Sequence, residues 1–241
     1  AKESFQERAQ ELLSCNPDGV VLSPIYVQEA SQLIGEFTQR RIPFVLVNTN
    51  IPDCNQCLSF IGQDYFQSGL LAAKLMHFGM VGNIKVVILN IIRENSLQQH
   101  LQRRENGFRE YFKRVPNASL TTVNVNGVGQ EMVDRELRRL LIMNDGNMGL
   151  FVTNSKVYKA ANFLDQVGFS NIRLVGYDLV EPSRNYLQKG TIDFLINQRS
   201  EEQGYRGLMS IFQHLVLKRN VEQNQYMPLD IITRENLKYY R

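Results

Sequence analysis

Long hydrophobic runs are missing from this sequence of 241 residues. No run approaches the roughly 20 apolar residues that a helix needs to span a bilayer, and no segment has the pattern of a signal peptide. We therefore expect no membrane among the partners of this chain. Apolar residues make up 43% and charged residues 21% of the sequence, which is typical of a soluble globular protein.

An excess of charge of one sign is also missing. The 27 basic and 24 acidic residues leave a formal net charge of +3. Nucleic acids are bound through clustered positive charge, and the basic pair Arg103 and Arg104 is too short to form such a cluster. The charge therefore gives no reason to expect that this chain itself contacts DNA.

Metal-binding spacings are scarce as well. Cys54 and Cys57 form a CxxC motif, but no second CxxC follows and the three histidines are scattered, so we expect no metal site. The motif follows a Pro-Asp pair in a loop and does not open a helix, so we interpret it as exposed loop thiols in a reducing compartment. With Cys15 the cysteine count is odd, which favours the cytoplasm. The histidines are His77, His100 and His214.

Catalytic motifs are absent too. The sequence contains no GxSxG and no glycine-rich phosphate-binding loop, and no histidine has an evident partner. We therefore expect neither an enzyme nor a cofactor.

The most informative stretch that is present runs over 150–183. An apolar run ends in Thr153 and Asn154, a helical segment stops at Gly168, and a second apolar run ends in Tyr177 and Asp178. A connection of helical length predicts two parallel strands joined by a right-handed crossover. Both strands then end at the same edge of one sheet, where open α/β sheets bind ligands. Asn154 and Asp178 are candidate ligand contacts, although Asn154 could merely cap the helix that follows and Asp178 could start the next turn.

The same alternation of strands and helices continues along the chain and predicts an α/β fold with parallel sheets. It begins again after about residue 79, which indicates two lobes that share crossing segments, with a cleft between them. We place the first lobe at 1–79 with 195–222 and the second at 80–194 with 223–241. The predicted helices are 3–14, 27–40, 66–77, 97–113, 130–143 and 201–217, besides the helix that stops at Gly168. The predicted strands are 20–23, 43–47, 59–61, 85–89, 121–125, 172–175, 191–198 and 229–233, besides the strand that ends at Thr153.

Six segments, taken in order, resemble the effector-binding core of the lactose-repressor family of transcription regulators. They are IGQDYFQSGLLAAKLM, QRRENGFREYF, LFVTNSKVYKAANFL, LVGYDLVEPS, TIDFLINQRSEEQGYRGL and DIITRENL. The resemblance implies the fold of type-1 periplasmic sugar-binding proteins, in which two Rossmann-like lobes with parallel sheets are joined by crossing segments.

The resemblance also implies a set of ligand contacts that reach the cleft from both lobes and hold the hydroxyls of a sugar or polyol. An aromatic residue usually adds a platform for the sugar ring. Three of the implied contacts could have a purely structural role instead. These roles are a helix cap for Asp64, a surface ion pair with Glu105 or Glu110 for Arg104, and the start of a turn for Gln198. The implied polar contacts are Asp64, Arg104, Asn154, Asp178 and Gln198, and the aromatic candidates are Tyr26, Tyr65 and Tyr177.

The function implied is that of an effector-sensing domain in a homodimeric transcription regulator, in which a small effector alters DNA binding through a helix-turn-helix head. That head is missing here, so we expect a fragment whose first lobe is incomplete at its N-terminus. The exposed sheet edge would then be covered by a dimer contact or leave a soft lobe. The alternative is a periplasmic or membrane-tethered sugar-binding protein of the same fold.

Overall fold

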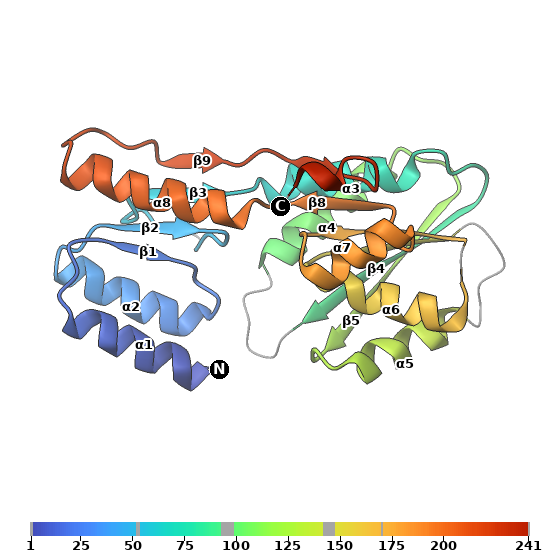
Figure 1. Cartoon of the computed structure of the whole chain (residues 1–241), viewed down its shortest axis with the longest axis horizontal. Coiled ribbons are helices and arrows are strands. Elements are labelled where there is room, and N and C mark those ends of the chain that lie inside the picture. Colours follow the sequence, from blue (N-terminus) through green and yellow to red (C-terminus); the bar gives the residue numbers. More distant parts are fainter. Residues whose placement is uncertain (1, 52–53, 93–98, 142–147, 170, 241) are drawn as a thin grey trace. The chain divides into compact units, whose positions relative to one another are not determined.

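The computed structural model describes residues 2–51, 54–92, 99–141, 148–169 and 171–240 (Figure 1). These residues form two compact units. Unit 1 consists of the described residues up to Gln63 together with Arg199–Pro228, and unit 2 consists of the described residues of Asp64–Glu94, Gln98–Gln198 and Leu229–Arg241. Within the described part of the chain, no helix is both long and apolar enough to cross a membrane.

Unit 1 is built on a four-stranded sheet in the order β1-β2-β3-β9, in which every pair is parallel. One face of the sheet is covered by α2, whose Leu33 and Phe37 pack with Phe44 of β2, and α1 adds a second layer on that side. The other face is covered by α8 through Ile211. The elements are α1 (Lys2–Ser14), β1 (Val20–Leu22), α2 (Val27–Gln39), β2 (Phe44–Val47), β3 (Ser59–Gly62), α8 (Ser200–Leu215) and β9 (Asn224–Tyr226).

Unit 2 is built on a six-stranded sheet in the order β10-β8-β7-β6-β4-β5. All neighbouring strands are parallel except β10, which runs antiparallel to β8. Strand β4 is buried at eight of its nine positions, as expected for a central parallel strand with helices on both faces. The strands are β4 (Ile84–Ile92), β5 (Ala118–Asn126), β6 (Met148–Val152), β7 (Ile172–Tyr177), β8 (Phe194–Asn197) and β10 (Asp230–Ile232).

The helices of unit 2 divide between the two faces of its sheet. On one face, α3 and α4 pack through Met76 and Phe108 against Ile88 and Phe151. On the other face, α5, α6 and α7 pack over a larger cluster that includes Leu150. These helices are α3 (Tyr65–His77), α4 (Gln99–Phe112), α5 (Gln130–Leu141), α6 (Val157–Val167) and α7 (Glu181–Lys189), and a 3-10 turn, η1 (Leu237–Tyr239), follows β10.

The contact between α3 and α4 depends on two glycines. A Cβ atom on Gly69 would lie 2.0 Å from the backbone oxygen of Arg104, and a Cβ atom on Gly107 would lie 2.0 Å from the backbone oxygen of Phe66. Each glycine therefore lets the other helix approach to backbone contact. This contact fixes the depth at which the Arg104 side chain enters unit 2.

The α/β fold with two units and parallel sheets agrees with the prediction from the sequence, but three assignments to the lobes were wrong. Residues 195–198, which we assigned to the first lobe, belong to unit 2. The structure places α3 in unit 2 and not in the first lobe, because α3 packs on α4. It places β9 in unit 1, where it pairs with β3, although we assigned residues after 222 to the second lobe. The last strand, β10, runs antiparallel to β8, a direction that the sequence did not predict. The pattern also failed to predict α7 and β9. The ends of two predicted helices, 97–98 and 142–143, lie outside the described residues.

Candidate functional site

Arg104 is the centre of a buried polar network in unit 2. Helix α4 carries it, and only 1% of its surface is exposed. Its Nη1 donates to the backbone oxygen of Thr153 at 2.7 Å, and its Nη2 donates to Oε1 of Gln198 at 2.5 Å. The residue is therefore not paired on the surface with Glu105, which instead binds Arg109 at 2.8 Å. Arg104 ties the end of β6 to the end of β8.

Gln198 connects Arg104 to Asp178. Its Nε2 donates to Oδ2 of Asp178 at 2.6 Å, and its backbone N donates to Oδ1 at 3.3 Å. Asp178 follows β7 directly and has a left-handed backbone with φ of 67°, which turns the chain at the strand end. Burial raises the pKa of Asp178, while the charge of Arg104 and the bonds from Gln198 oppose that rise. Hydrogen bonds therefore connect Arg104 to Gln198 and Gln198 to Asp178 at the carboxyl ends of β7 and β8.

Two tyrosines flank the guanidinium group of Arg104. Its Cζ lies 3.7 Å from the ring centroid of Tyr177 and 5.1 Å from that of Tyr65, which are distances of cation–π contacts. Tyr177 is fully buried, its hydroxyl accepts from Oγ of Ser68 at 2.9 Å, and burial raises the pKa of that hydroxyl. The ring of Tyr177 therefore holds Arg104 in place, and we no longer expect it to be an open platform for a sugar.

Asp64 and Tyr26 lie outside this network. Asp64 caps α3, because its Oδ1 accepts from the backbone N of Phe66 and of Gln67 at 3.0 and 3.1 Å, and the cap also places the adjacent Tyr65. Tyr26 belongs to unit 1, where it precedes α2 and packs edge-on against Phe5, with 5.9 Å between the two ring centroids. The expectation that the polar contacts come from both lobes was wrong, because all five belong to unit 2.

Asn154 borders the network through its neighbour Thr153. Its Nδ2 donates to the backbone oxygen of Ile91 at 2.9 Å, and its Oδ1 accepts from the backbone N of Lys156 at 3.1 Å. The side chain thus joins the ends of β4 and β6 and forms the turn that leads to α6. The alternative from the sequence was a cap on the following helix, but the structure places the N-cap of α6 at Lys156.

Sequence reasoning missed His100, which stands one helical turn before Arg104 on α4 and so on the same face. The centroid of its ring lies 5.8 Å from that of the Tyr65 ring, and its Nδ1 is buried with no hydrogen-bond partner in the described residues. Burial, followed by the charges of Arg104 and Lys156, lowers the pKa of His100 to about 3. The spacing of four residues from Arg104 is the signal in the sequence that could have revealed it.

A second layer of polar residues supports Thr153. Its Oγ1 donates to Oδ1 of Asn90 at 2.7 Å, and Nδ2 of Asn90 donates to Glu105 at 3.2 Å and to Asn124 of β5 at 2.9 Å. The pKa of Glu105 is lowered because hydrogen bonds from Thr122, Arg109 and Asn90 outweigh the opposing effect of its burial. A chain of hydrogen bonds therefore runs from Arg104 to the edge of the sheet.

The CxxC motif lies in unit 1 and is not exposed, in contrast to our interpretation. Cys57 is buried and Cys54 is half-buried, and Sγ of Cys57 donates to the backbone oxygen of Cys54 at 3.2 Å. Hydrogen bonding from Cys57 lowers the pKa of Cys54 to about 7, although burial opposes this. Among the described residues, no three histidine, cysteine, aspartate or glutamate side chains are grouped so that they could hold a metal ion.

Comparison with known proteins gives a consistent result. The sequence model of the periplasmic binding protein domain matches residues 1–219, whereas a search of curated protein sequences gave no match. The structure is similar to a crystal structure from Bacteroides fragilis that is assigned as a LacI transcriptional regulator, with 30% identity and a TM-score of 0.86, and the match covers 100% of this chain and 84% of that one.

Sugar-binding proteins with lower identity share the fold. GanP, a glucose-galactose binding protein from Geobacillus stearothermophilus, has 19% identity and a TM-score of 0.85 over 98% of this chain and 84% of its own. A solute-binding protein from Agrobacterium vitis with bound alpha-D-tagatopyranose has 22% identity and a TM-score of 0.83 over 96% of this chain and 80% of its own. At these identities the likeness concerns the fold alone.

Proposed function

Because the chain belongs to the periplasmic binding protein domain family, we propose that it binds a sugar or sugar-like small molecule and serves as the effector-binding part of a LacI-type transcription regulator. The proposed ligand contacts are those that the sequence suggested, Asp64, Arg104, Asn154, Asp178, Gln198, Tyr26 and Tyr65, with His100 added and Tyr177 as the support of Arg104. No residue is proposed to have a catalytic role.

The observation that carries the proposal is two buried polar atoms of α4 without partners, one of them on Arg104, which bonds to residues that follow β6 and β8. Nε of Arg104 and Nδ1 of His100 have no hydrogen-bond partner among the described residues, and such atoms call for an explanation because burying them unpaired is costly. The Asp178 carboxylate retains lone pairs beyond those that Gln198 uses. Donors, acceptors and a neutral imidazole in one place suit hydroxyl groups better than a strongly charged ligand.

The choice of a regulator rests on the comparison at 30% identity. The second candidate is a transport binding protein, favoured by the similar solute-binding proteins with D-arabinose and D-allose. The two candidate functions predict different segments encoded upstream of residue 1. A helix-turn-helix segment in the complete coding sequence supports the regulator, whereas a signal peptide there would select the transport protein and the periplasm.

In the regulator, the effector acts by shifting an equilibrium between two states of a dimer. A ligand shifts such an equilibrium only by the difference between its affinities for the two states. DNA contact is assigned to the helix-turn-helix head and to no residue of this chain.

The test is a thermal-shift screen of the purified chain with D-arabinose, D-allose, D-tagatose, D-glucose and D-galactose, followed by calorimetry. A sugar that binds only the native state raises the melting temperature. We expect Asp178→Asn to weaken binding of that sugar by about 10- to 150-fold, the loss of a hydrogen bond to a charged group. The matched control is Asp165→Asn, which removes an exposed pair with Lys189 and retains wild-type affinity. Equal affinity in both variants would remove Asp178 from the site.

A further inference from the structure

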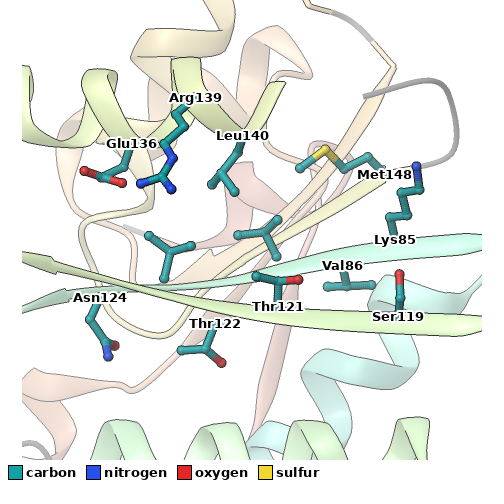
Figure 2. A pocket seen from close by; sticks show the side chains of 12 residues that line it. Lys85, Val86, Ser119, Thr121, Thr122, Asn124, Glu136, Arg139, Leu140 and Met148 are labelled. Carbon is teal, nitrogen blue, oxygen red and sulfur yellow. The ribbon is translucent and has the colours of Figure 1, made fainter. Parts of the chain in front are cut away.

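The CxxC turn of unit 1 differs from the polar hollow of unit 2. That hollow, of about 680 Å³, is lined by residues of α5, β4, β5 and β6, and Figure 2 shows Lys85, Glu136 and Arg139 around it. Lys85 and Arg139 are exposed, and Glu136 is paired with Arg135 at 3.6 Å, so water and a surface ion pair satisfy these charges. The CxxC turn instead brings two thiols within hydrogen-bonding reach of each other.

The backbone of the turn between β2 and β3 suits a disulfide bond. Asn55 and Gln56 form the turn, and the first and last Cα atoms of a four-residue turn lie less than about 7 Å apart. A disulfide needs a Cα separation of about 4.4–6.8 Å. Sγ of Cys57 donates to the backbone oxygen of Cys54 at 3.2 Å, so the Cys57 side chain is already directed toward Cys54.

The chain on both sides of the turn is anchored. Before the turn, the N of Cys54 donates to the oxygen of Ile51 at 3.3 Å, and after it the N of Leu58 donates to the oxygen of Phe44 in β2 at 2.8 Å. Ile51 and Cys54 also pack against the apolar cluster that contains Cys57. Joining the two sulfur atoms therefore requires rotation of the two side chains and leaves the pairing of β2 with β3 in place.

The two thiols differ in exposure and in protonation. Cys54 is half-buried, whereas Cys57 is buried in the cluster with Phe44 and Phe60. Hydrogen bonds from the Cys57 thiol and from the backbone N–H groups of Cys57 and Gln56 lower the pKa of Cys54 to about 7, against the effect of burial. The hydrogen bond with Cys54, followed by burial, raises the pKa of Cys57. Near pH 7 the thiolate, which is the nucleophilic form, therefore resides on Cys54.

We propose that Cys54 and Cys57 form a redox-active dithiol that reacts with low-molecular-weight disulfides. Cys54 loses its proton to water, attacks one sulfur of the small disulfide and forms a mixed disulfide, and the other sulfur leaves as a thiolate that takes a proton from water. Cys57 then attacks the Cys54 sulfur, its proton passes to the second departing thiolate, and the Cys54–Cys57 disulfide closes. Two electrons move from the protein to the small disulfide, which leaves as two thiols.

This inference does not depend on the proposed function. Both cysteines belong to unit 1, whereas the network around Arg104 belongs to unit 2. The dithiol therefore reacts whether or not the chain binds a sugar, and the experiments below contain no sugar. Their failure would leave the proposed ligand site unaffected.

The first test treats the reduced chain with oxidised glutathione at pH 7, blocks the remaining thiols with iodoacetamide and measures the mass of the intact chain. The parent is Cys15→Ala, which removes the exposed third cysteine. We expect the parent to lose both thiols and retain no glutathione, whereas Cys57→Ala in this background retains one glutathione, on Cys54. Alanine suits this position because a free buried cysteine behaves as a small apolar residue.

The matched control keeps Cys15 and carries Cys54→Ala and Cys57→Ala. Its exposed thiol should retain glutathione, because no second thiol is left to displace it. A parent that stays reduced or keeps glutathione overturns the proposal. The absence of glutathione from Cys57→Ala would equally remove Cys54 as the attacking thiol.

The second test begins with the wild-type chain and therefore does not depend on a variant that folds. Initial rates of alkylation by iodoacetamide are measured for each cysteine by peptide mass spectrometry between pH 5 and pH 9. We expect the rate at Cys54 to be half-maximal near pH 7 and the rate at Cys57 to be at least about tenfold lower at that pH, because Cys57 is buried and protonated.

The same profile of Cys57→Ala tests the coupling of the two thiols. The midpoint for Cys54 should move to higher pH, because the largest cause of its lowered pKa, the hydrogen bond from the Cys57 thiol, is lost. A purely structural role of Cys57 would leave this midpoint unchanged. That result, or faster alkylation of Cys57 than of Cys54 in wild type, would refute the proposed roles.

Discussion

Arg104 shows what a single side chain contributes to this protein. Two separate nitrogens of its planar guanidinium group donate hydrogen bonds to the backbone oxygen of Thr153 and to the side chain of Gln198. A lysine at this position could not reproduce that geometry. The ring of Tyr177 and the backbone contact at Gly69 define its depth. A buried charge is tolerated only when it is paired and hydrogen-bonded, and here Gln198 mediates its contact with Asp178. Truncation of any of these residues would therefore disturb both stability and the site.

His100 should make the stability of the protein depend on pH. In the folded chain its pKa is about 3, whereas an exposed histidine has a pKa of about 6.5. Between these values the unfolded chain binds a proton that the folded chain does not bind. The free energy of unfolding therefore falls as the pH decreases from 6.5, by up to about 1.4 kcal/mol per pH unit from this residue.

The measurement is urea unfolding of wild type and His100→Gln at several values between pH 7 and pH 4.5. Asp178, Asp193 and Glu105 also have shifted pKa values, so the informative quantity is the difference between the two proteins. We expect the stability of His100→Gln to fall less steeply with acidification. Parallel curves would show that His100 is protonated equally in the folded and unfolded chains.

The helices α3 and α4 are packed in backbone contact. Gly69→Ala places a methyl group against the backbone of Arg104, so the helices must separate. We expect a loss of about 1–3 kcal/mol in the free energy of unfolding, the usual cost of overpacking, with Gly107→Ala behaving alike. The matched control is Gly35→Ala in α2, where the added Cβ meets no atom within 4 Å. This control should be neutral or stabilising by up to about 1 kcal/mol, and equal effects at Gly35 and Gly69 would contradict the close approach.

Prediction from sequence succeeds where the pattern is local. Runs with a clear period predicted nearly all helices and strands, and the structure places Asp178 and Asn154 after the carboxyl ends of β7 and β6, where the sequence predicted strand ends. The sequence could not assign α3 to a unit, because that depends on the contact of Gly69 with α4. It also missed β9, whose three residues NQY carry no pattern. Its place follows from distant partners, since Gln225 donates to Ser59 at 3.1 Å and to Ser210 at 2.9 Å.

At the scale of the whole molecule, the two units differ in how their sheets are supported. The strands of unit 1 have three or four residues, whereas β4 of unit 2 has nine and is paired along both sides. One edge of β1 has no partner strand in the described residues. On the neighbouring helix α8, Tyr205 and Leu208 are 65% and 63% exposed. Unit 1 therefore buries less apolar surface around β1 than unit 2 buries around β4.

Hydrogen exchange should reveal this difference directly. Local stability follows buried contacts and backbone pairing, so the amides of Val20 and Leu22 should exchange faster than those of Val86 and Ile88 under native conditions. The comparison needs no assumption about ligand or partner, and the amides of Leu46 in β2 serve as an internal reference because that strand is paired on both sides. If Val20 and Leu22 are as protected as Val86 and Ile88, an additional strand or a second chain must cover β1 in solution, and the open edge of unit 1 would have to be assigned an occupant.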